Sequence, residues 1–92
     1  MGYKHLDGYE WKFKEVTGPS NYDPTKGIEV TFGVERIDKV VSILSEGGYV
    51  PSNINISGNK VVFHVYVSGG SEVTSGTDLS AVKFQLMVLA KP

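Results

Sequence analysis

The chain contains no cysteine, which excludes disulfide bonds, thiolate catalysis and cysteine-based zinc sites. It also lacks an apolar run approaching the about 20 residues that a membrane-spanning helix needs. Basic residues are few and scattered. The chain has nine Lys and Arg and ten Asp and Glu, which gives a net charge of −1. Nucleic-acid binding relies on clustered Lys and Arg. We therefore predict no nucleic-acid partner and no membrane partner.

The length of 92 residues fits a single domain, and an apolar content of 40% is sufficient for one core. We divide the chain into an N-terminal arm, residues 1–8, and one domain, residues 9–92. The first residues show no basic-then-apolar signal pattern. We expect a protein that stays in the cell that makes it, or leaves that cell as part of an assembly.

Strict alternation of apolar and polar residues is the dominant pattern. Tyr9, Trp11 and Phe13 alternate with charged residues, and this predicts a strand whose aromatic face, Trp11 included, lies in the core. The segment 39–44 is apolar on both faces and predicts a central or doubly covered strand. Similar alternation occurs over 28–33, 53–57, 61–67 and 81–90.

The turns between these segments complete the prediction. Gly58 and Asn59 separate two alternating segments, and this predicts a tight β-hairpin. Two long polar loops, 18–27 and 69–80, connect other segments. About six to seven short strands with Gly and Pro between them are typical of an all-β sandwich. We predict a single-domain antiparallel β-sandwich, Ig-like or jelly-roll-like, with no substantial helix.

Candidate catalytic groups lack visible partners in the sequence. Of the two histidines, His5 lies in the arm and His64 lies in a strand beside Val62 and Tyr66, without a neighbouring carboxylate on its face. No sequence motif indicates a serine nucleophile or a phosphate-binding loop. We therefore predict no catalytic residue, no cofactor and no metal, and expect that the protein is not an enzyme.

Surface residues are left to carry a function. Tyrosines outside the strongest core stripes are suited to protein contacts, and the final segment becomes apolar on both faces at Met87 and Leu89. That second apolar face indicates either a covered strand or a contact with another subunit. The predicted protein-interface residues are Tyr3, Leu6, Tyr22, Tyr49, Met87 and Leu89.

The order of turn motifs along the chain resembles a known group of proteins. The motifs are GPSNY at 18–22, RIDKVVS at 36–42, GGY at 47–49, GNKV at 58–61 and GTDLSAVKF at 76–84. This series is similar to the small all-β structural proteins of tailed bacteriophages and related archaeal viruses, from about residue 16 onward. The resemblance implies a head decoration or cement protein of the virion, assembled in the host cytoplasm. It also implies binding to the major capsid protein or another virion protein, and a homo-oligomer.

Two other functions stay open. A carbohydrate-binding or adhesion sandwich of a tail or fibre predicts tyrosines gathered on one face or at one end. A small enzyme predicts a concave pocket that holds His64 or His5 with a carboxylate within hydrogen-bonding reach. We rank the structural role first and the enzyme last.

Overall fold

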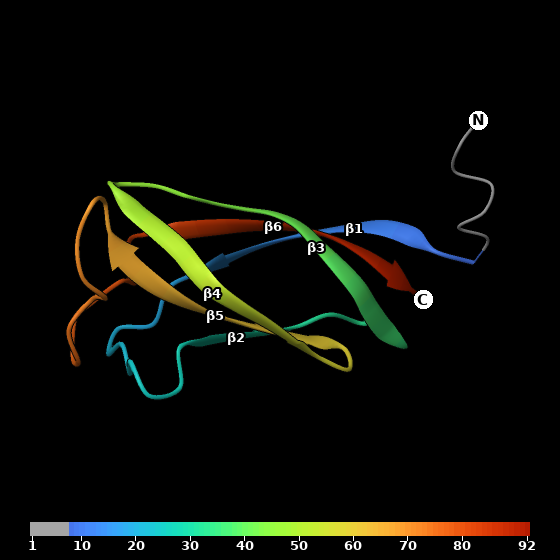
Figure 1. Ribbon diagram of the computed structural model, residues 1–92, viewed down its shortest axis with the longest axis horizontal. Coiled ribbons are helices and arrows are strands. Elements are labelled where there is room, and N and C mark those ends of the chain that lie inside the picture. The colour runs from blue at the N-terminus through green and yellow to red at the C-terminus, as the bar shows by residue number, and fades with distance from the viewer. Residues whose placement is uncertain (1–7) are drawn as a thin grey trace.

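The computed structural model describes residues 8–92, which form six strands and no helix (Figure 1). The strands are β1 (Glu10–Thr17), β2 (Ile28–Thr31), β3 (Arg36–Ser45), β4 (Tyr49–Ser57), β5 (Lys60–Val67) and β6 (Lys83–Lys91). The predictions for Tyr3 and Leu6 lie outside the described residues. Within those residues no helix exists that could cross a membrane.

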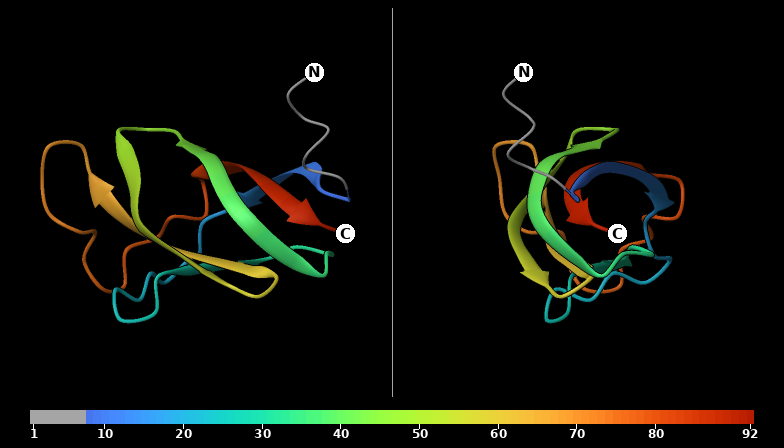
Figure 2. Two further views of the ribbon diagram at one scale, coloured as in Figure 1. Left: turned by 45° about the vertical axis from the view of Figure 1, so that its right-hand side comes forward. Right: turned by 90° about the vertical axis from the view of Figure 1, so that its right-hand side faces the viewer.

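The strands form two antiparallel sheets of three strands each. The first sheet has the order β1-β6-β3 and the second has the order β2-β5-β4. The chain changes sheets after β1, β2, β3 and β5, so each sheet mixes early and late segments. Viewed along the long axis of the molecule, the sheets curve around a shared interior (Figure 2). The all-β prediction is thus confirmed, with two antiparallel sheets.

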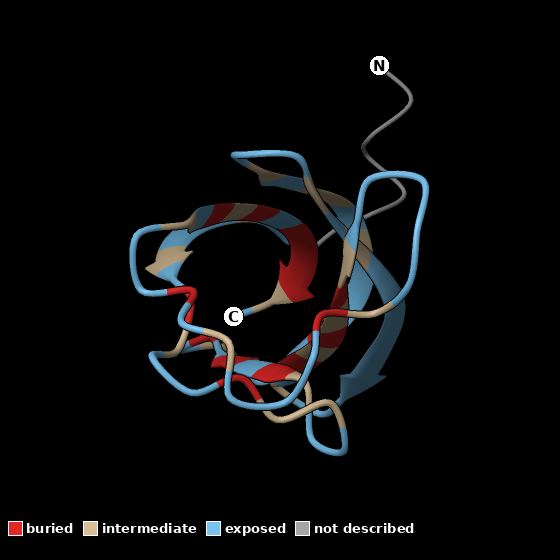
Figure 3. Cartoon of the chain, turned by 90° about the vertical axis from the view of Figure 1, so that its left-hand side faces the viewer, coloured by how far each residue is buried: buried red, intermediate tan, exposed pale blue. Residues whose placement is uncertain are grey.

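The core lies between the inward faces of these sheets. Phe63 on β5 and Phe84 on β6 meet at its centre, with ring centroids 5.3 Å apart. Both central strands alternate between buried and more exposed residues, and the buried residues line the interior (Figure 3). The predicted stripe Ile28, Val30 and Phe32 is buried as well. Period-two alternation therefore identified the inward faces of β2, β5 and most of β6.

The β4–β5 hairpin is confirmed. Ser57 pairs with Lys60, and Gly58 has a φ of 61°. Glycine tolerates this conformation because it has no Cβ. A two-residue turn of this kind matches the right-handed twist of the strands that it joins.

The inward face predicted for β1 is wrong. Trp11 is 54% exposed and Phe13 is 62% exposed, because they lie opposite the outward residues Leu89 and Met87 of β6. The alternate residues of β1 point to the core side. Of these, Lys14 extends past the core and donates a hydrogen bond to the carbonyl of Thr31 at 2.6 Å.

The central position predicted for segment 39–44 is also wrong, because β3 lies at an edge of its sheet. Two register shifts, between Ile37 and Lys39 and between Val40 and Ser42, interrupt the pairing with β6. Each bulge adds one residue to β3. Both faces of the segment are apolar because Val40 packs on the core while Val41 is exposed.

Candidate functional site

The outer face of the β1-β6-β3 sheet carries the largest exposed apolar side chains of the described chain. Trp11 and Phe13 of β1 lie beside Leu89 and Met87 of β6. Met87 is 38% exposed, whereas Leu89 is only 7% exposed since Trp11 and Lys39 flank it on the two neighbouring strands. Isolated apolar residues are normal on a protein surface, but a contiguous group usually marks an interaction site.

The third strand extends this apolar surface. Leu44 of β3 lies opposite Gln85 and is 60% exposed, and Val41 is exposed at the second bulge. We call Trp11, Phe13, Val41, Leu44 and Met87, together with the residues between them on this side of the sheet, the outer face. Large aromatic side chains are enriched at protein interfaces because they bury much apolar area at a small entropy cost. The outer face is therefore suited to contact with another protein.

The predicted interface residues are dispersed in the structure. Met87 and Leu89 belong to the outer face. Tyr49 begins β4, an edge strand of the second sheet, and Tyr22 is fully buried in the core. Tyr22 therefore cannot offer its side chain to a partner of the folded domain. The sequence placed it on the surface because it lies in a polar loop, whereas the two residues that dominate the outer face, Trp11 and Phe13, were assigned to the core.

A second feature is a cluster of three polar side chains. The Tyr22 hydroxyl donates to Oε2 of Glu72 at 2.7 Å, and Nδ1 of His64 lies 2.7 Å from the same oxygen. Because an ionised carboxylate only accepts, Nδ1 of His64 carries the hydrogen in this contact. The Tyr22 hydroxyl in turn accepts a hydrogen bond from the backbone N–H of Val65 at 2.9 Å.

The short length of β2 explains why this cluster exists. Its pairing with β5 ends where Ile28 meets Phe63, so the backbone of Val65 has no partner strand on that side. The hydroxyl of Tyr22 accepts the Val65 N–H, and the N–H of Val73 donates to the Val65 carbonyl at 2.8 Å. Buried backbone groups need such partners, since an unpaired one costs free energy. The cluster thus completes the hydrogen bonding of β5 beyond the end of β2.

The same contacts shift two pKa values. Hydrogen bonds from Tyr22 and His64 hold the pKa of Glu72 below its ordinary value. Burial, with the Glu72 carboxylate nearby, raises the pKa of Tyr22 far above its ordinary value. Glu72 stays ionised and Tyr22 stays protonated near neutral pH, which is the state that their hydrogen bond requires.

The carboxylate beside His64 was not predicted from the sequence. Glu72 lies in the long loop after β5 and comes back to this strand through an isolated bridge with Tyr66. Such a loop has no hydrophobic periodicity, so the sequence does not show that Glu72 lies back against β5. The contact satisfies half of the pattern expected for a small enzyme, namely a histidine with a carboxylate in reach.

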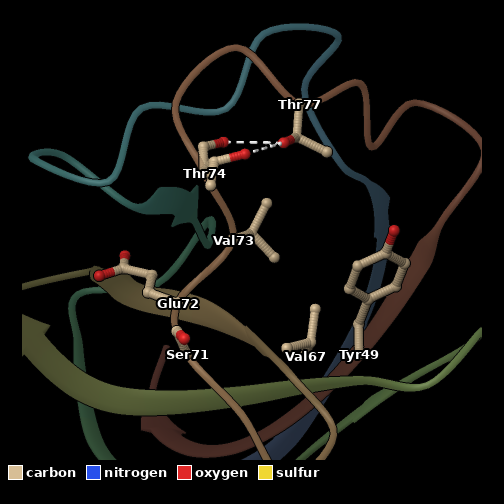
Figure 4. A pocket seen from close by; sticks show the side chains of 7 residues that line it. All are labelled: Tyr49, Val67, Ser71, Glu72, Val73, Thr74 and Thr77. Carbon is tan, nitrogen blue, oxygen red and sulfur yellow. Dashed lines mark hydrogen bonds between the residues drawn. The ribbon is translucent and has the colours of Figure 1, made fainter.

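A shallow hollow lies next to this cluster. It has a volume of about 270 Å³ and is lined by Tyr49, Val67, Ser71, Glu72, Val73, Thr74 and Thr77. The Tyr49 ring forms one wall, Val67 and Val73 lie between it and Glu72, and the carboxylate of Glu72 points away from the ring (Figure 4). His64 is not part of the lining. The hollow therefore does not enclose the histidine and carboxylate together.

Residues 8–92 contain no group of three or more His, Asp or Glu side chains that lies close enough to hold a metal ion. The contact between His64 and Glu72 supplies only two ligand atoms, fewer than zinc sites use.

Comparisons with protein-family models, with curated proteins and with solved structures give no match for this chain.

Proposed function

We propose that this chain is a non-enzymatic structural protein that works by docking to other proteins through its outer face. The observation that carries this proposal is the exposure of Trp11 and Phe13 beside Met87 on one side of a regular sheet. Exposed aromatic side chains on a rigid surface form contacts with little loss of conformational freedom.

The setting that we propose is a virus particle. The resemblance to small structural proteins of tailed bacteriophages and archaeal viruses supports a decoration or cement protein. Such a protein binds the major capsid protein, or another virion protein, in many copies and stabilises the shell. We take the two sheets as the layers of a β-sandwich, with an Ig-like or jelly-roll-like topology as the finer prediction.

The experiment uses capsids assembled from the capsid gene of the genome that encodes this chain. Purified protein is mixed with these capsids and sedimented through a sucrose gradient. We expect the protein to travel with the capsids, and we expect Trp11→Glu and Phe13→Glu to reduce the bound amount by at least about tenfold, because a buried charge opposes docking. Val50→Glu is the matched control, since Val50 is an exposed valine on the other sheet.

Two results would contradict the proposal. One is a genome without a capsid gene. The other is wild-type protein that remains at the top of the gradient at every ratio of protein to capsid.

The hollow supports a second candidate, a carbohydrate-binding or adhesion module of a tail or fibre. Sugars stack on aromatic rings and hydrogen bond to hydroxyl and carboxylate groups. Tyr49 supplies a ring, and Thr74 and Thr77 supply hydroxyls beside it. The other tyrosines weigh against this candidate, because Tyr22 is buried and Tyr66 lies opposite Val50 rather than at the hollow.

A glycan array separates the two candidates. Binding to particular sugars that is lost in Tyr49→Ala and kept in Phe13→Glu would favour the carbohydrate-binding module. An array without hits would remove this second candidate.

A further inference from the structure

Four strands lie at sheet edges, and three of them have features that oppose the addition of another strand. Strand β2 has only four residues. Strand β3 is interrupted by two register shifts and β4 by one. Strand β4 also contains Pro51, which has no N–H to donate. Short, bulged and proline-containing edges are common protection against strand addition.

Strand β1 has none of these features. Its eight residues, without glycine or proline, pair with β6 in one unbroken register from Glu10 to Thr17. No strand of the part of the chain that the structure describes pairs with the other edge of β1. A regular open edge of this length can bind an extended segment of another protein as an additional strand.

The register shows which backbone groups this open edge offers. The N–H of Gly18 donates to the carbonyl of Val82 at 2.9 Å, and this contact continues the β1–β6 register as a hydrogen-bonded pair. Hydrogen-bonded pairs alternate along an antiparallel ladder, so the backbone groups of Val16 and Lys14 also point to β6. The residues whose N–H and C=O groups face the open edge are therefore Trp11, Phe13 and Glu15.

The edge position also explains why the aromatic side chains of β1 are exposed. Leu89 lies on a central strand and has cross-strand neighbours on both sides, which bury it. Trp11 and Phe13 have a cross-strand neighbour on one side only. An additional strand would supply the second neighbour, and aromatic rings pair favourably with β-branched residues across strands. Its residues on this side should therefore be apolar.

The other face of β1 carries positive charge. Lys12 and Lys14 lie opposite the buried residues of β6 and so point to the core side. The Nζ of Lys12 lies 2.9 Å from Glu10. Lys14 instead donates to the neutral carbonyl of Thr31 and forms no ion pair with a carboxylate of residues 8–92. An acidic residue opposite Lys14 would supply the counter-ion, in a non-hydrogen-bonded pair where side chains lie closest.

We propose that β1 binds an extended segment of a partner protein as an additional antiparallel strand, in which acidic residues alternate with apolar residues. This inference rests on the proposed structural role and names the part of the partner that docks. The apolar side chains extend the outer face beside Trp11 and Phe13, and the acidic side chains face Lys12 and Lys14. In such a complex the backbone hydrogen bonds supply affinity, and the alternate side chains supply specificity.

The same lysines disfavour a second copy of this chain at the edge. In an antiparallel pair of β1 strands centred on Phe13, Lys12 of one copy would lie opposite Lys14 of the other. Like charges directly opposite each other destabilise a sheet, and inward-pointing lysines oppose pairing of identical edges. An acidic segment of a different protein is therefore the occupant that fits this edge.

The test is NMR of the isotope-labelled chain with a synthetic peptide of about ten residues in which valine and glutamate alternate, up to about 2 mM. We expect slower hydrogen exchange at the amides of Trp11, Phe13 and Glu15. The Lys12 amide, which already bonds to β6, should not change. N-methylation of the valines should abolish binding, because their amides face β1 in this arrangement.

Charge is tested with a second peptide and two variants. A peptide with lysine in place of glutamate should bind at least about fivefold more weakly. Lys14→Glu should shift the preference towards the lysine peptide by at least about fivefold, since it reverses the charge on this face. Lys26→Glu, at an exposed loop lysine, is the matched control and should keep the wild-type preference. Thermal unfolding of each variant verifies that the domain folds.

Three outcomes would overturn the additional strand: no slowing at the three edge amides at any peptide concentration, equal binding of the two peptides, or a preference altered as much by Lys26→Glu as by Lys14→Glu. Failure here is distinct from failure of the proposed function. A chain that travels with capsids but binds neither peptide refutes the additional strand alone. A chain that binds the acidic peptide but never binds capsids refutes the virion role alone.

Discussion

Glu72 is the residue on which two partners converge. A carboxylate whose pKa is lowered by folding stabilises the native state above its ordinary pKa of 4.5, and this contribution is lost as the pH falls through the lowered value. We expect Glu72→Gln to lower the free energy of unfolding by about 1–2 kcal/mol at pH 7, since it weakens hydrogen bonds with Tyr22 and His64. The difference from wild type should shrink towards pH 3. Urea unfolding at both pH values measures it.

Glu29→Gln serves as the matched control for this residue. The Glu29 carboxylate pairs with Lys60 at 3.8 Å and is exposed, so its replacement should change the free energy of unfolding by no more than about 0.5 kcal/mol. A deficit in Glu72→Gln that is equally large at pH 3 and pH 7 would show that the charge of Glu72 plays no part.

Tyr22 gives a prediction at alkaline pH. Its pKa is raised above the ordinary value of 10 mainly by burial, so its contribution to stability is complete below pH 10 and is lost as the pH rises further. Tyr22→Phe leaves the Val65 N–H without an acceptor and should cost about 1–3 kcal/mol. In an ultraviolet titration, wild type and Tyr22→Phe should show the same tyrosinate signal until they unfold. A smaller signal for the folded variant would mean that Tyr22 titrates in the native state.

At the scale of elements, Gly18 lies where the loop that follows β1 packs closely against the loop around Leu79. It follows β1, and its N–H donates to the carbonyl of Val82 at 2.9 Å. A Cβ at Gly18 would lie 2.5 Å from both the Cβ and the carbonyl oxygen of Leu79. We expect Gly18→Ala to lower the free energy of unfolding by about 1–3 kcal/mol, because the buried loop around Leu79 must move. Chemical denaturation measures the change.

Gly33→Ala is the matched control for this crossing. A Cβ at Gly33 has nothing within 4 Å, so the substitution should be nearly neutral or slightly stabilising. Equal destabilisation by the two substitutions would show that contact with Leu79 is not the cause.

Strand β1 shows how far the sequence predicts an element. Alternation at Trp11 and Phe13 correctly predicted a strand, because an extended chain has a period of two. The choice of inward face failed, since hydrophobicity alone favoured the aromatic side. The pairing with β6 determines which face of β1 points inward. Val16 packs on the core beside Phe84, so Lys12 and Lys14 lie on the same side of the strand. That register is a long-range property that alternation does not contain.

The residues of the candidate site were likewise predictable only where a local pattern exists. Met87 was predicted from the second apolar face of the final segment, a local signal that the structure places on the outer face. Tyr22 was predicted at a protein interface and Glu72 at no site, because both lie in polar loops whose path depends on the packed sheets. Loops without periodicity give no sequence signal for which side chains they bring together.

The whole molecule offers a way to distinguish face contact from edge contact. Strands β5 and β6 are central in their sheets, so their amides should exchange hydrogen most slowly, while β1, β2, β3 and β4 lie at edges. Face-to-face pairing forms no new backbone hydrogen bonds. We therefore expect the β1 amides that point away from β6 to exchange equally fast in dilute and concentrated samples, measured residue by residue by NMR.

Edge-to-edge pairing predicts the opposite result, because every second amide of β1 would gain a partner across the interface. Concentration-dependent protection along β1 would therefore assign the contact to the edge, despite Lys12 and Lys14. Unchanged exchange in β1 would exclude this edge strand as the surface through which copies meet.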